Sequence, residues 1–287
     1  MGNVYDAMKK HEAEQAEQAS QSAPAQGQAE QPAEAPPAAG QAQAGPQVAS
    51  PAPRPAPAAA AISRNGNYSE LLVAHHDRGG PITEEYRALR TNLLASCPDG
   101  RLCYLVTSAE AGEGKTITCM NLALVMAERV DRRTIVIDSD LRKGRMAKLL
   151  GAPASPGVAD LLLGSKALKE CVQATGYPNL FFLPAGEVES RQVGELVGRP
   201  EFEEVTAQLR REYDCVIFDT PPINRASDAG IMGRAIGEAL LVLRMNRTHR
   251  ETVDKAIRLL HAANVKVNGI VLTHQKYYIP NYLYRYS

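Results

Sequence analysis

The sequence predicts an α/β fold in which a mostly parallel sheet carries helices on both faces. Three observations support this prediction. From about residue 67 onward, short apolar segments alternate with segments of helical character, and this alternation is typical of parallel strands joined by crossover helices. The apolar segments are continuous runs, as expected of strands that are covered on both sides. A loop of small residues follows the first apolar run, and such loops bind phosphates at the edges of parallel sheets.

The expected elements follow one another in chain order. A helix is expected over residues 83–95, where Thr83 is the candidate N-cap and Tyr86, Leu89 and Leu93 form an apolar stripe. Further helices are expected at residues 116–129, 144–150, 158–163, 192–211, 228–236 and 251–263. Strands are expected at residues 102–107, 134–138, 180–183, 215–219, 239–244 and 267–273.

Composition divides the chain into three parts. Residues 4–12 allow either a short amphipathic helix or a frayed terminus. Alanine, glutamine, proline and glutamate dominate residues 13–62, which contain no aromatic residue, and this composition predicts a disordered tether. We therefore expect a helix and tether over residues 1–66, a globular domain over 67–275 and a short tail over 276–287.

Charge and hydropathy exclude several classes of partner. The 32 basic and 32 acidic residues give a formal net charge of zero, so there is no electrostatic case for binding nucleic acid. No apolar stretch approaches the roughly 18 residues of a membrane span, and the N-terminus lacks the apolar core of a secretory signal. A cytoplasmic protein is therefore expected. Its five cysteines show no CxxC spacing, which predicts reduced thiols.

The strongest motif is Leu-Val-Thr-Ser-Ala-Glu-Ala-Gly-Glu-Gly-Lys-Thr at residues 105–116. A strand ends, a glycine-containing loop follows, and Gly-Lys-Thr opens a helix, so backbone amides and the helix N-terminus favour bound phosphate. Lys115 is expected to reach the β- and γ-phosphates and Thr116 to bind Mg²⁺. Ala109 stands where the usual pattern has its first glycine. The motif predicts a P-loop NTPase-like fold with ATP and Mg²⁺ as cofactors.

The nucleotide-binding residues expected from this motif are consecutive in the chain. They are Ser108, Ala109, Glu110, Ala111, Gly112, Glu113, Gly114, Lys115, Thr116 and Ile117.

Two further segments end expected strands with carboxylates. Asp138 and Asp140 follow one strand, and Asp219 ends another in the sequence Val-Ile-Phe-Asp-Thr-Pro-Pro. The carboxyl ends of parallel strands form the ligand-binding edge of a sheet. These carboxylates could hold Mg²⁺ or accept a proton, whereas ordinary turn chemistry is the alternative for each segment alone. Lys115, Asp138, Asp140 and Asp219 are the candidate catalytic residues, and Thr116, Asp138 and Asp219 the candidate metal ligands.

The last residues of the chain are rich in tyrosine. The cluster comprises Tyr277, Tyr278, Tyr282, Tyr284 and Tyr286. Its last three members alternate as in a half-buried strand, but Pro280 and Asn281 interrupt the run. Together with a nucleotide site, the cluster suggests that these phenols receive the nucleotide's phosphate.

These residues resemble the bacterial tyrosine kinases (BY-kinases), the autokinases of capsule and exopolysaccharide export. The resemblance covers roughly residues 67–287. The three motifs are similar to the family's Walker A, Walker A′ and Walker B motifs, and Glu84, Arg87 and Arg90 are similar to its E-x2-R-x2-R oligomerisation motif. From charge pattern alone, that helix face would be an ordinary solvated surface.

The resemblance implies specific roles and partners. Asp138 would accept the tyrosine's proton, and the tail tyrosines would be phosphorylated by a neighbouring subunit of a ring-like homo-oligomer that Glu84, Arg87 and Arg90 hold together. A transmembrane chain-length-determinant co-polymerase would activate the kinase at the inner membrane, and a tyrosine phosphatase would reverse the modification.

Two other functions remain open at this level. A switch ATPase of the partition or division-site type has a related fold, but such proteins usually carry a second lysine where this chain has Glu110. A catalytically silent scaffold is the other alternative, against which the complete set of Lys115, Asp138 and Asp219 argues.

Overall fold

The computed structural model describes Ile62, residues 67–97 and residues 100–275. The predicted tyrosine tail and, apart from Ile62, the predicted N-terminal helix and tether lie outside the described residues. The domain limits at residues 67 and 275 therefore stay predictions. Among the described residues, no helix is both long and apolar enough to cross a membrane.

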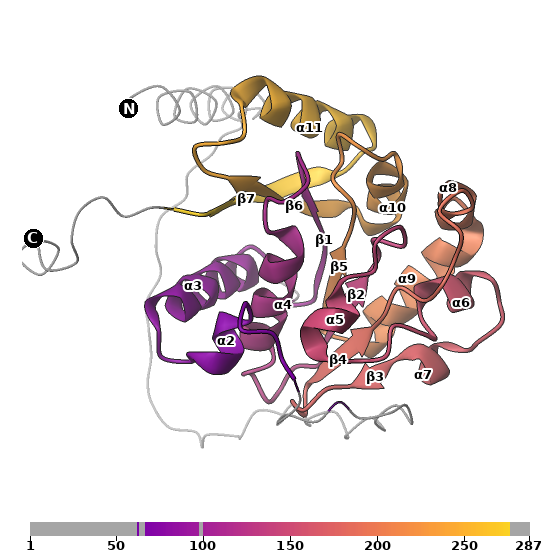
Figure 1. Cartoon of the computed structure of the whole chain (residues 1–287), viewed down its shortest axis with the longest axis horizontal. Coiled ribbons are helices and arrows are strands. Elements are labelled where there is room, and N and C mark those ends of the chain that lie inside the picture. Colours follow the sequence, from indigo (N-terminus) through magenta and orange to yellow (C-terminus); the bar gives the residue numbers. More distant parts are fainter. Residues whose placement is uncertain (1–61, 63–66, 98–99, 276–287) are drawn as a thin grey trace, which may run out of the picture. The chain divides into compact units, whose positions relative to one another are not determined.

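The described residues form one seven-stranded sheet in the order β3-β4-β2-β5-β1-β6-β7 (Figure 1). Its strands are β1 Leu102–Ser108, β2 Thr134–Asp138, β3 Gln173–Ala174, β4 Leu180–Leu183, β5 Cys215–Asp219, β6 Glu238–Arg244 and β7 Lys266–Thr273. All neighbouring pairs are parallel except β3 and β4. The mostly parallel sheet is therefore confirmed. The two-residue β3 was not predicted because so short a strand has no recognisable pattern.

The described helices precede or connect these strands. They are α2 Val73–His76, α3 Pro81–Ala95, α4 Lys115–Met126, α5 Met146–Leu150, α6 Val158–Leu162, α7 Leu168–Cys171, α8 Val193–Val197, α9 Pro200–Glu212, α10 Asp228–Ile236 and α11 Arg250–Ala262. The short helices α2 and α7 were not predicted.

Two expectations about the helices were wrong, one about a cap and one about the length of a helix. Thr83 does not cap α3, because the helix already begins at Pro81 and the Thr83 hydroxyl donates to the Asp77 carbonyl at 2.6 Å. The helix expected over residues 192–211 is two helices, α8 and α9. Arg199 between them has extended backbone angles, since the residue before a proline is disfavoured in the helical region.

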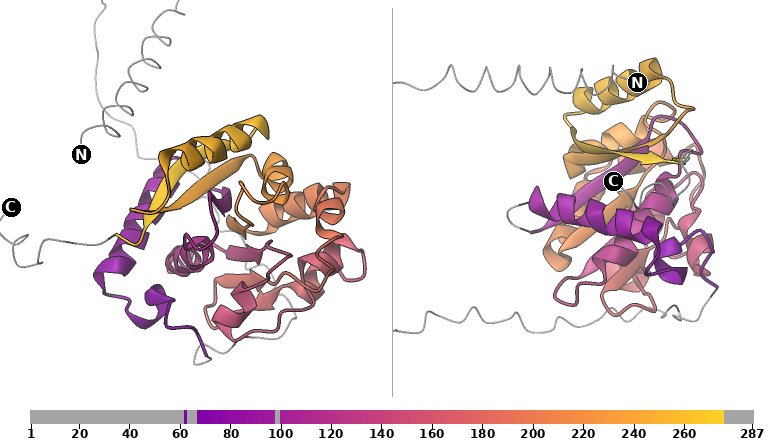
Figure 2. Two further views of the ribbon diagram at one scale, coloured as in Figure 1. Left: turned by 45° about the horizontal axis from the view of Figure 1, so that its top comes forward. Right: turned by 90° about the vertical axis from the view of Figure 1, so that its left-hand side faces the viewer.

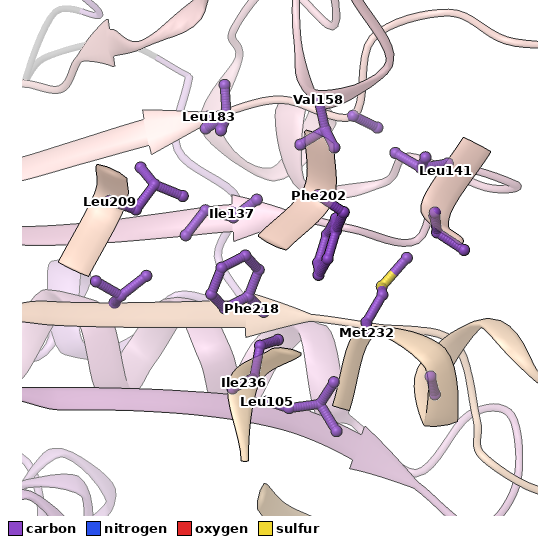
Figure 3. Packing of buried hydrophobic residues seen from close by; sticks show 14 of the residues in the cluster. Leu105, Ile137, Leu141, Val158, Leu183, Phe202, Leu209, Phe218, Met232 and Ile236 are labelled. Atoms are coloured by element: carbon purple, nitrogen blue, oxygen red, sulfur yellow. The ribbon is translucent and has the colours of Figure 1, made fainter. Parts of the chain in front are cut away.

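Helices cover both faces of the sheet, as predicted. Helices α2 to α5 pack on one face and α6 to α11 on the other, so the core forms two buried clusters with the sheet between them. Figure 3 shows Phe202 and Met232 from the second helix layer beside Phe218 and Ile137 of the sheet. Helix α11 runs alongside β7, which forms one edge of the sheet (Figure 2). Because alternate strand residues point to opposite faces, continuous apolar strands fill both clusters.

Candidate active site

The three predicted motifs meet at one edge of the sheet. Strands β2 and β5 are neighbours, and Asp138 and Asp219 are paired in register at their carboxyl ends. On its other side β5 pairs with β1, where Asp219 is in register with Val106. The loop that follows β1 therefore starts beside Asp219, with Asp138 one strand further along the sheet. Hydrogen bonds fix this edge further, since Thr107 Oγ1 donates to the carbonyl of Pro221 at 2.8 Å.

The loop between β1 and α4 has the backbone of a phosphate cradle. Gly112 and Gly114 have φ values of 84° and 93°, in the left-handed region that glycine adopts without strain. Helix α4 starts directly after Gly114, and no side chain caps its N-terminus. The first amides of α4 and its positive dipole end therefore remain available to a phosphate.

Lys115 and Thr116, the first residues of α4, turn toward Asp219. The ammonium of Lys115 lies 3.2 Å from Asp219 Oδ1 and 3.5 Å from Asp140 Oδ2. The hydroxyl of Thr116 donates to Asp219 Oδ2 at 2.6 Å. Burial disfavours the charge on Lys115, but Asp219 and Asp140 outweigh this effect and raise its pKa. The lysine is therefore held charged among the carboxylates.

Asp138 is buried and held by two backbone amides. Its carboxylate accepts from the amide of Met146 at 2.8 Å and from that of Asp140 at 3.3 Å. Burial, and then the nearby charge of Asp219, raise the pKa of Asp138 to about 7. Burial also raises the pKa of Asp219, against the pull of Lys115. Two neighbouring buried carboxylates thus oppose each other's ionisation.

The side chains of Thr116, Asp138 and Asp219 fit a Mg²⁺ ion that a nucleotide also binds. No group of three or more His, Cys, Asp or Glu side chains in the described part of the chain is arranged to hold a metal. Mg²⁺ usually keeps waters and binds through one or two carboxylates plus substrate phosphates. The contact between Thr116 and Asp219 supplies such a partial ligand set, and a cation there would relieve the repulsion between Asp219 and Asp138.

The remaining predicted residues belong to the end of β1, to the loop after it and to the first turn of α4. Ser108 Oγ donates to the carbonyl of Glu110 at 2.7 Å, which tightens the start of the loop. Ala109 is fully buried, and Ile117 lies within α4. Beside the loop is a cavity of about 410 Å³. It is lined by Ala109, Glu110, Asn224, Arg225, Glu251, Thr252 and Lys255, and its walls beyond the loop were not predicted from sequence.

Sequence reasoning also missed an ion pair that supports the site. Arg142, in the loop after β2, donates from Nε and Nη2 to the two carboxylate oxygens of Asp228 at 2.7 and 3.2 Å. Asp228 is only 1% exposed and begins α10. The pair fastens the loop that carries Asp140 to the opposite helix layer. The two residues are 86 positions apart, and no local pattern connects them.

The charged face of α3 is engaged within the chain. Glu84, Arg87 and Arg90 lie near one another, as their spacing predicts, and both arginines bind Glu128 just beyond α4. Arg87 Nε donates to Glu128 at 3.0 Å, and Arg90 Nη1 donates to it at 2.8 Å. Arg87 also forms an ion pair with Glu84. Their contact with another subunit stays a prediction, and the five tail tyrosines lie outside the described residues.

Comparisons with known proteins identify the family. Residues 105–235 match the AAA domain family. Tyrosine-protein kinase YwqD of Bacillus subtilis (strain 168) is 32% identical over 215 residues, which cover 75% of this chain and 90% of YwqD. Tyrosine-protein kinase wzc of Salmonella typhi is 33% identical over 205 residues, or 71% of this chain and 28% of wzc.

A solved structure agrees with these matches. The kinase domain of Escherichia coli tyrosine kinase ETK superposes with a TM-score of 0.66 at 28% identity, covering 73% of this chain and 83% of that domain. The chain thus spans little more than a quarter of its longer relative wzc, but most of YwqD and of the ETK domain. This chain belongs to the family of bacterial tyrosine-protein kinases.

Proposed function

We propose that this protein is an ATP-dependent protein-tyrosine autokinase that phosphorylates the tyrosine tail of a neighbouring subunit. The observation that carries the proposal is the buried cluster at the start of α4, where Lys115 and Thr116 both contact Asp219 beneath a loop of phosphate-binding form. Family membership supplies the acceptor class, since the matched relatives are named tyrosine-protein kinases.

In this proposal, each residue acts on one part of the reaction. The loop amides and Lys115 hold the β- and γ-phosphates of the substrate ATP. A tyrosine phenol attacks the γ-phosphorus, the bond from that phosphorus to the β–γ bridging oxygen breaks, and ADP leaves. Asp138, whose pKa is raised by burial and by the charge of Asp219, accepts the phenolic proton. Most of the acceleration comes from positioning and from stabilising charge on the transferred group.

Mg²⁺, bound through Thr116 and Asp219 and assisted by Asp138, would neutralise charge on the phosphates. Asp140 contacts Lys115 at 3.5 Å and orients the lysine beside the phosphates. The remaining predicted residues, from Ser108 to Ile117, form the loop backbone and the first turn of α4 that enclose the nucleotide.

The proposed acceptor tyrosines come only a few residues after the last strand in the sequence. Strand β7 ends at Thr273, whose hydroxyl donates to the carbonyl of Glu113 in the phosphate-binding loop at 2.7 Å. Tyr277 comes four residues later, and a twelve-residue tail spans about 40 Å when extended. That length supports transfer between subunits, with Glu84, Arg87 and Arg90 forming the contact in a ring-like homo-oligomer.

Further partners follow from the family. We propose that a transmembrane co-polymerase of capsule or exopolysaccharide export recruits and activates this kinase at the inner membrane, and that a tyrosine phosphatase reverses the modification.

One mixing experiment tests both the activity and its direction. The chain truncated after Gln275 keeps the proposed site but lacks acceptors, and full-length Lys115→Met keeps acceptors but lacks the loop lysine. Each alone should give no phosphotyrosine with Mg·ATP, whereas the mixture should label the Lys115→Met chain. Lys169→Met, at an exposed position of α7, is the matched control and should autophosphorylate normally.

Each alternative predicts a different result. ATP hydrolysis without phosphotyrosine would favour the switch ATPase. Phosphotyrosine in the full-length protein but none in the mixture would rule out transfer between subunits.

A further inference from the structure

Glu113 lies in the middle of the phosphate-binding loop, yet it is only 2% exposed. Gly112 before it and Gly114 after it both have left-handed backbone angles. These two left-handed residues change the direction of the chain on either side of Glu113. The Glu113 side chain therefore lies inside the fold, toward the end of β6, where its contacts are found.

Every oxygen of Glu113 accepts a hydrogen bond. Carboxylate Oε2 accepts from the backbone amide of Glu110, at the other end of the same loop, at 2.7 Å. Oε1 accepts from the hydroxyl of Thr248 and, at 3.4 Å, from the amide of Arg244. The main-chain carbonyl accepts from the hydroxyl of Thr273 at 2.7 Å. The loop is thereby connected to itself, to the end of β6 and to the end of β7.

Electrostatics do not explain the place of Glu113 in a phosphate-binding loop. The donors that reach the carboxylate are two backbone amides and one hydroxyl, all of them uncharged. A buried negative charge also repels the phosphates that this loop is proposed to bind. A neutral residue would serve phosphate binding better if electrostatics alone mattered. The hydrogen-bond geometry is therefore the property of Glu113 that favours nucleotide binding.

We propose that Glu113 is a positioning residue that holds the phosphate-binding loop in its nucleotide-receiving shape, with Thr248 as its partner. This inference rests on the proposed function. Glu113 acts through the loop backbone, since its own hydrogen bonds lead away from Lys115, Thr116 and Asp219. Its loss therefore weakens nucleotide binding and raises KM for ATP, while kcat of the bound complex changes little.

A comparison of two substitutions separates shape from charge. Glu113→Gln removes the charge but keeps the two closer contacts, because its amide oxygen accepts from Glu110 N and its NH₂ donates to the Thr248 hydroxyl; only the 3.4 Å contact from Arg244 N is lost. Glu113→Ala removes both. We expect Glu113→Gln to bind Mg·ADP within about threefold of the unchanged protein, and Glu113→Ala to bind at least about tenfold more weakly.

Thr248→Val gives a second, independent measurement. Valine has the shape of threonine without the hydroxyl, so this change removes one contact of Glu113 and leaves the carboxylate in place. We expect Thr248→Val to weaken Mg·ADP binding severalfold. Because the two side chains act as a unit, adding Thr248→Val to Glu113→Ala should change the affinity by less than about twofold.

The experiment is an equilibrium titration of each full-length variant with a fluorescent ADP analogue and Mg²⁺, followed by KM and kcat for ATP in tail phosphorylation. Circular dichroism melts show which variants are folded. Glu187→Ala, at an exposed loop position, is the matched control and should bind like the unchanged protein. Should Glu113→Ala fail to fold, Glu113→Gln and Thr248→Val decide the question by their affinities alone.

Two results would overturn the proposal. One is wild-type affinity in both Glu113→Ala and Thr248→Val. The other is a Glu113→Gln variant that loses affinity as severely as Glu113→Ala, because the carboxylate charge would then be the required feature. If the unchanged protein bound Mg·ADP but formed no phosphotyrosine, the kinase proposal would fail, while the same titrations would still decide the role of Glu113.

Discussion

The hydroxyl of Thr116 donates a 2.6 Å hydrogen bond to Oδ2 of Asp219, the residue that ends the central strand β5. The contact joins two motifs that are 103 residues apart in the chain. It places a hydroxyl oxygen and a carboxylate oxygen side by side, and Mg²⁺ favours such a pair of oxygen ligands beside phosphates.

Substitutions at Thr116 should therefore depend on the hydroxyl. Thr116→Ser keeps this oxygen and should retain phosphotyrosine formation within about threefold. Thr116→Val keeps the shape but loses the oxygen, and we expect activity to fall by about a hundredfold or more, since even outer partners of metal ligands are worth 10–100-fold. Phosphotyrosine formation measured over a range of Mg²⁺ concentrations checks this. Equal activity of the two variants would show that Thr116 is not a metal ligand.

The buried pair of Asp138 and Asp219 should make the metal-free, nucleotide-free protein less stable at high pH. The pKa of Asp138 is about 7 in the folded protein, against 3.8 for a free side chain. Between about pH 4 and 7, the folded state therefore keeps a proton on Asp138 that the unfolded state has lost. Stability contributed by this proton is present at low pH and decreases as the pH rises through that window.

Asp138→Asn should remove this part of the pH dependence. Asparagine has no charge to bury, although its NH₂ group cannot accept from one of the two backbone amides that Asp138 binds, so the net gain in stability over the unchanged protein at pH 8 should be about 2 kcal/mol. Part of the slope should remain, because burial also raises the pKa of Asp219. Urea unfolding in EDTA at several pH values between 4 and 8 measures both. Parallel stability curves for the two proteins would contradict the prediction.

The ion pair between Arg142 and Asp228 predicts an asymmetry in stability. Removing Arg142 leaves a carboxylate that is 1% exposed without its cation, whereas removing Asp228 leaves a guanidinium whose side chain is 37% exposed and can meet water. We expect Arg142→Met to lower the free energy of unfolding by about 3 kcal/mol and Asp228→Asn by about 1 kcal/mol. Urea unfolding at pH 8 compares them, and equal losses would mean that the burial of Asp228 does not determine the cost of breaking the pair.

The sheet could be predicted well because its signals are local. Continuous apolar runs locate the central strands, and the residues that end β1, β2 and β5 are polar. Because the carboxyl ends of parallel strands meet at one edge of a sheet, the fold and the meeting of these motifs could be predicted, whereas the order of the strands could not. The sequence carries no local signal for contacts between residues that are far apart in the chain. Arg142 finds Asp228, and Glu113 finds Thr248, across loops whose approach depends on the packed helix layers.

The partner of Arg87 and Arg90 could not be predicted from their own helix either. Their spacing indicates a shared face of α3, but Glu128 reaches that face only because α3 packs against α4. While both guanidinium groups donate to Glu128, these hydrogen-bond donors cannot bind a carboxylate of another subunit. If the proposed oligomer uses these arginines, Glu128 competes with it.

Neutralising Glu128 should therefore strengthen self-association. Partly exposed ion pairs contribute about 0–1 kcal/mol, so Glu128→Gln should change the free energy of unfolding by less than about 1 kcal/mol. It should nevertheless release the two guanidiniums and raise the association constant severalfold, measured by analytical ultracentrifugation at low salt. The double substitution Arg87→Gln, Arg90→Gln should abolish association in either background. Association that depends on neither the arginines nor Glu128 would place the subunit contact elsewhere on the molecule.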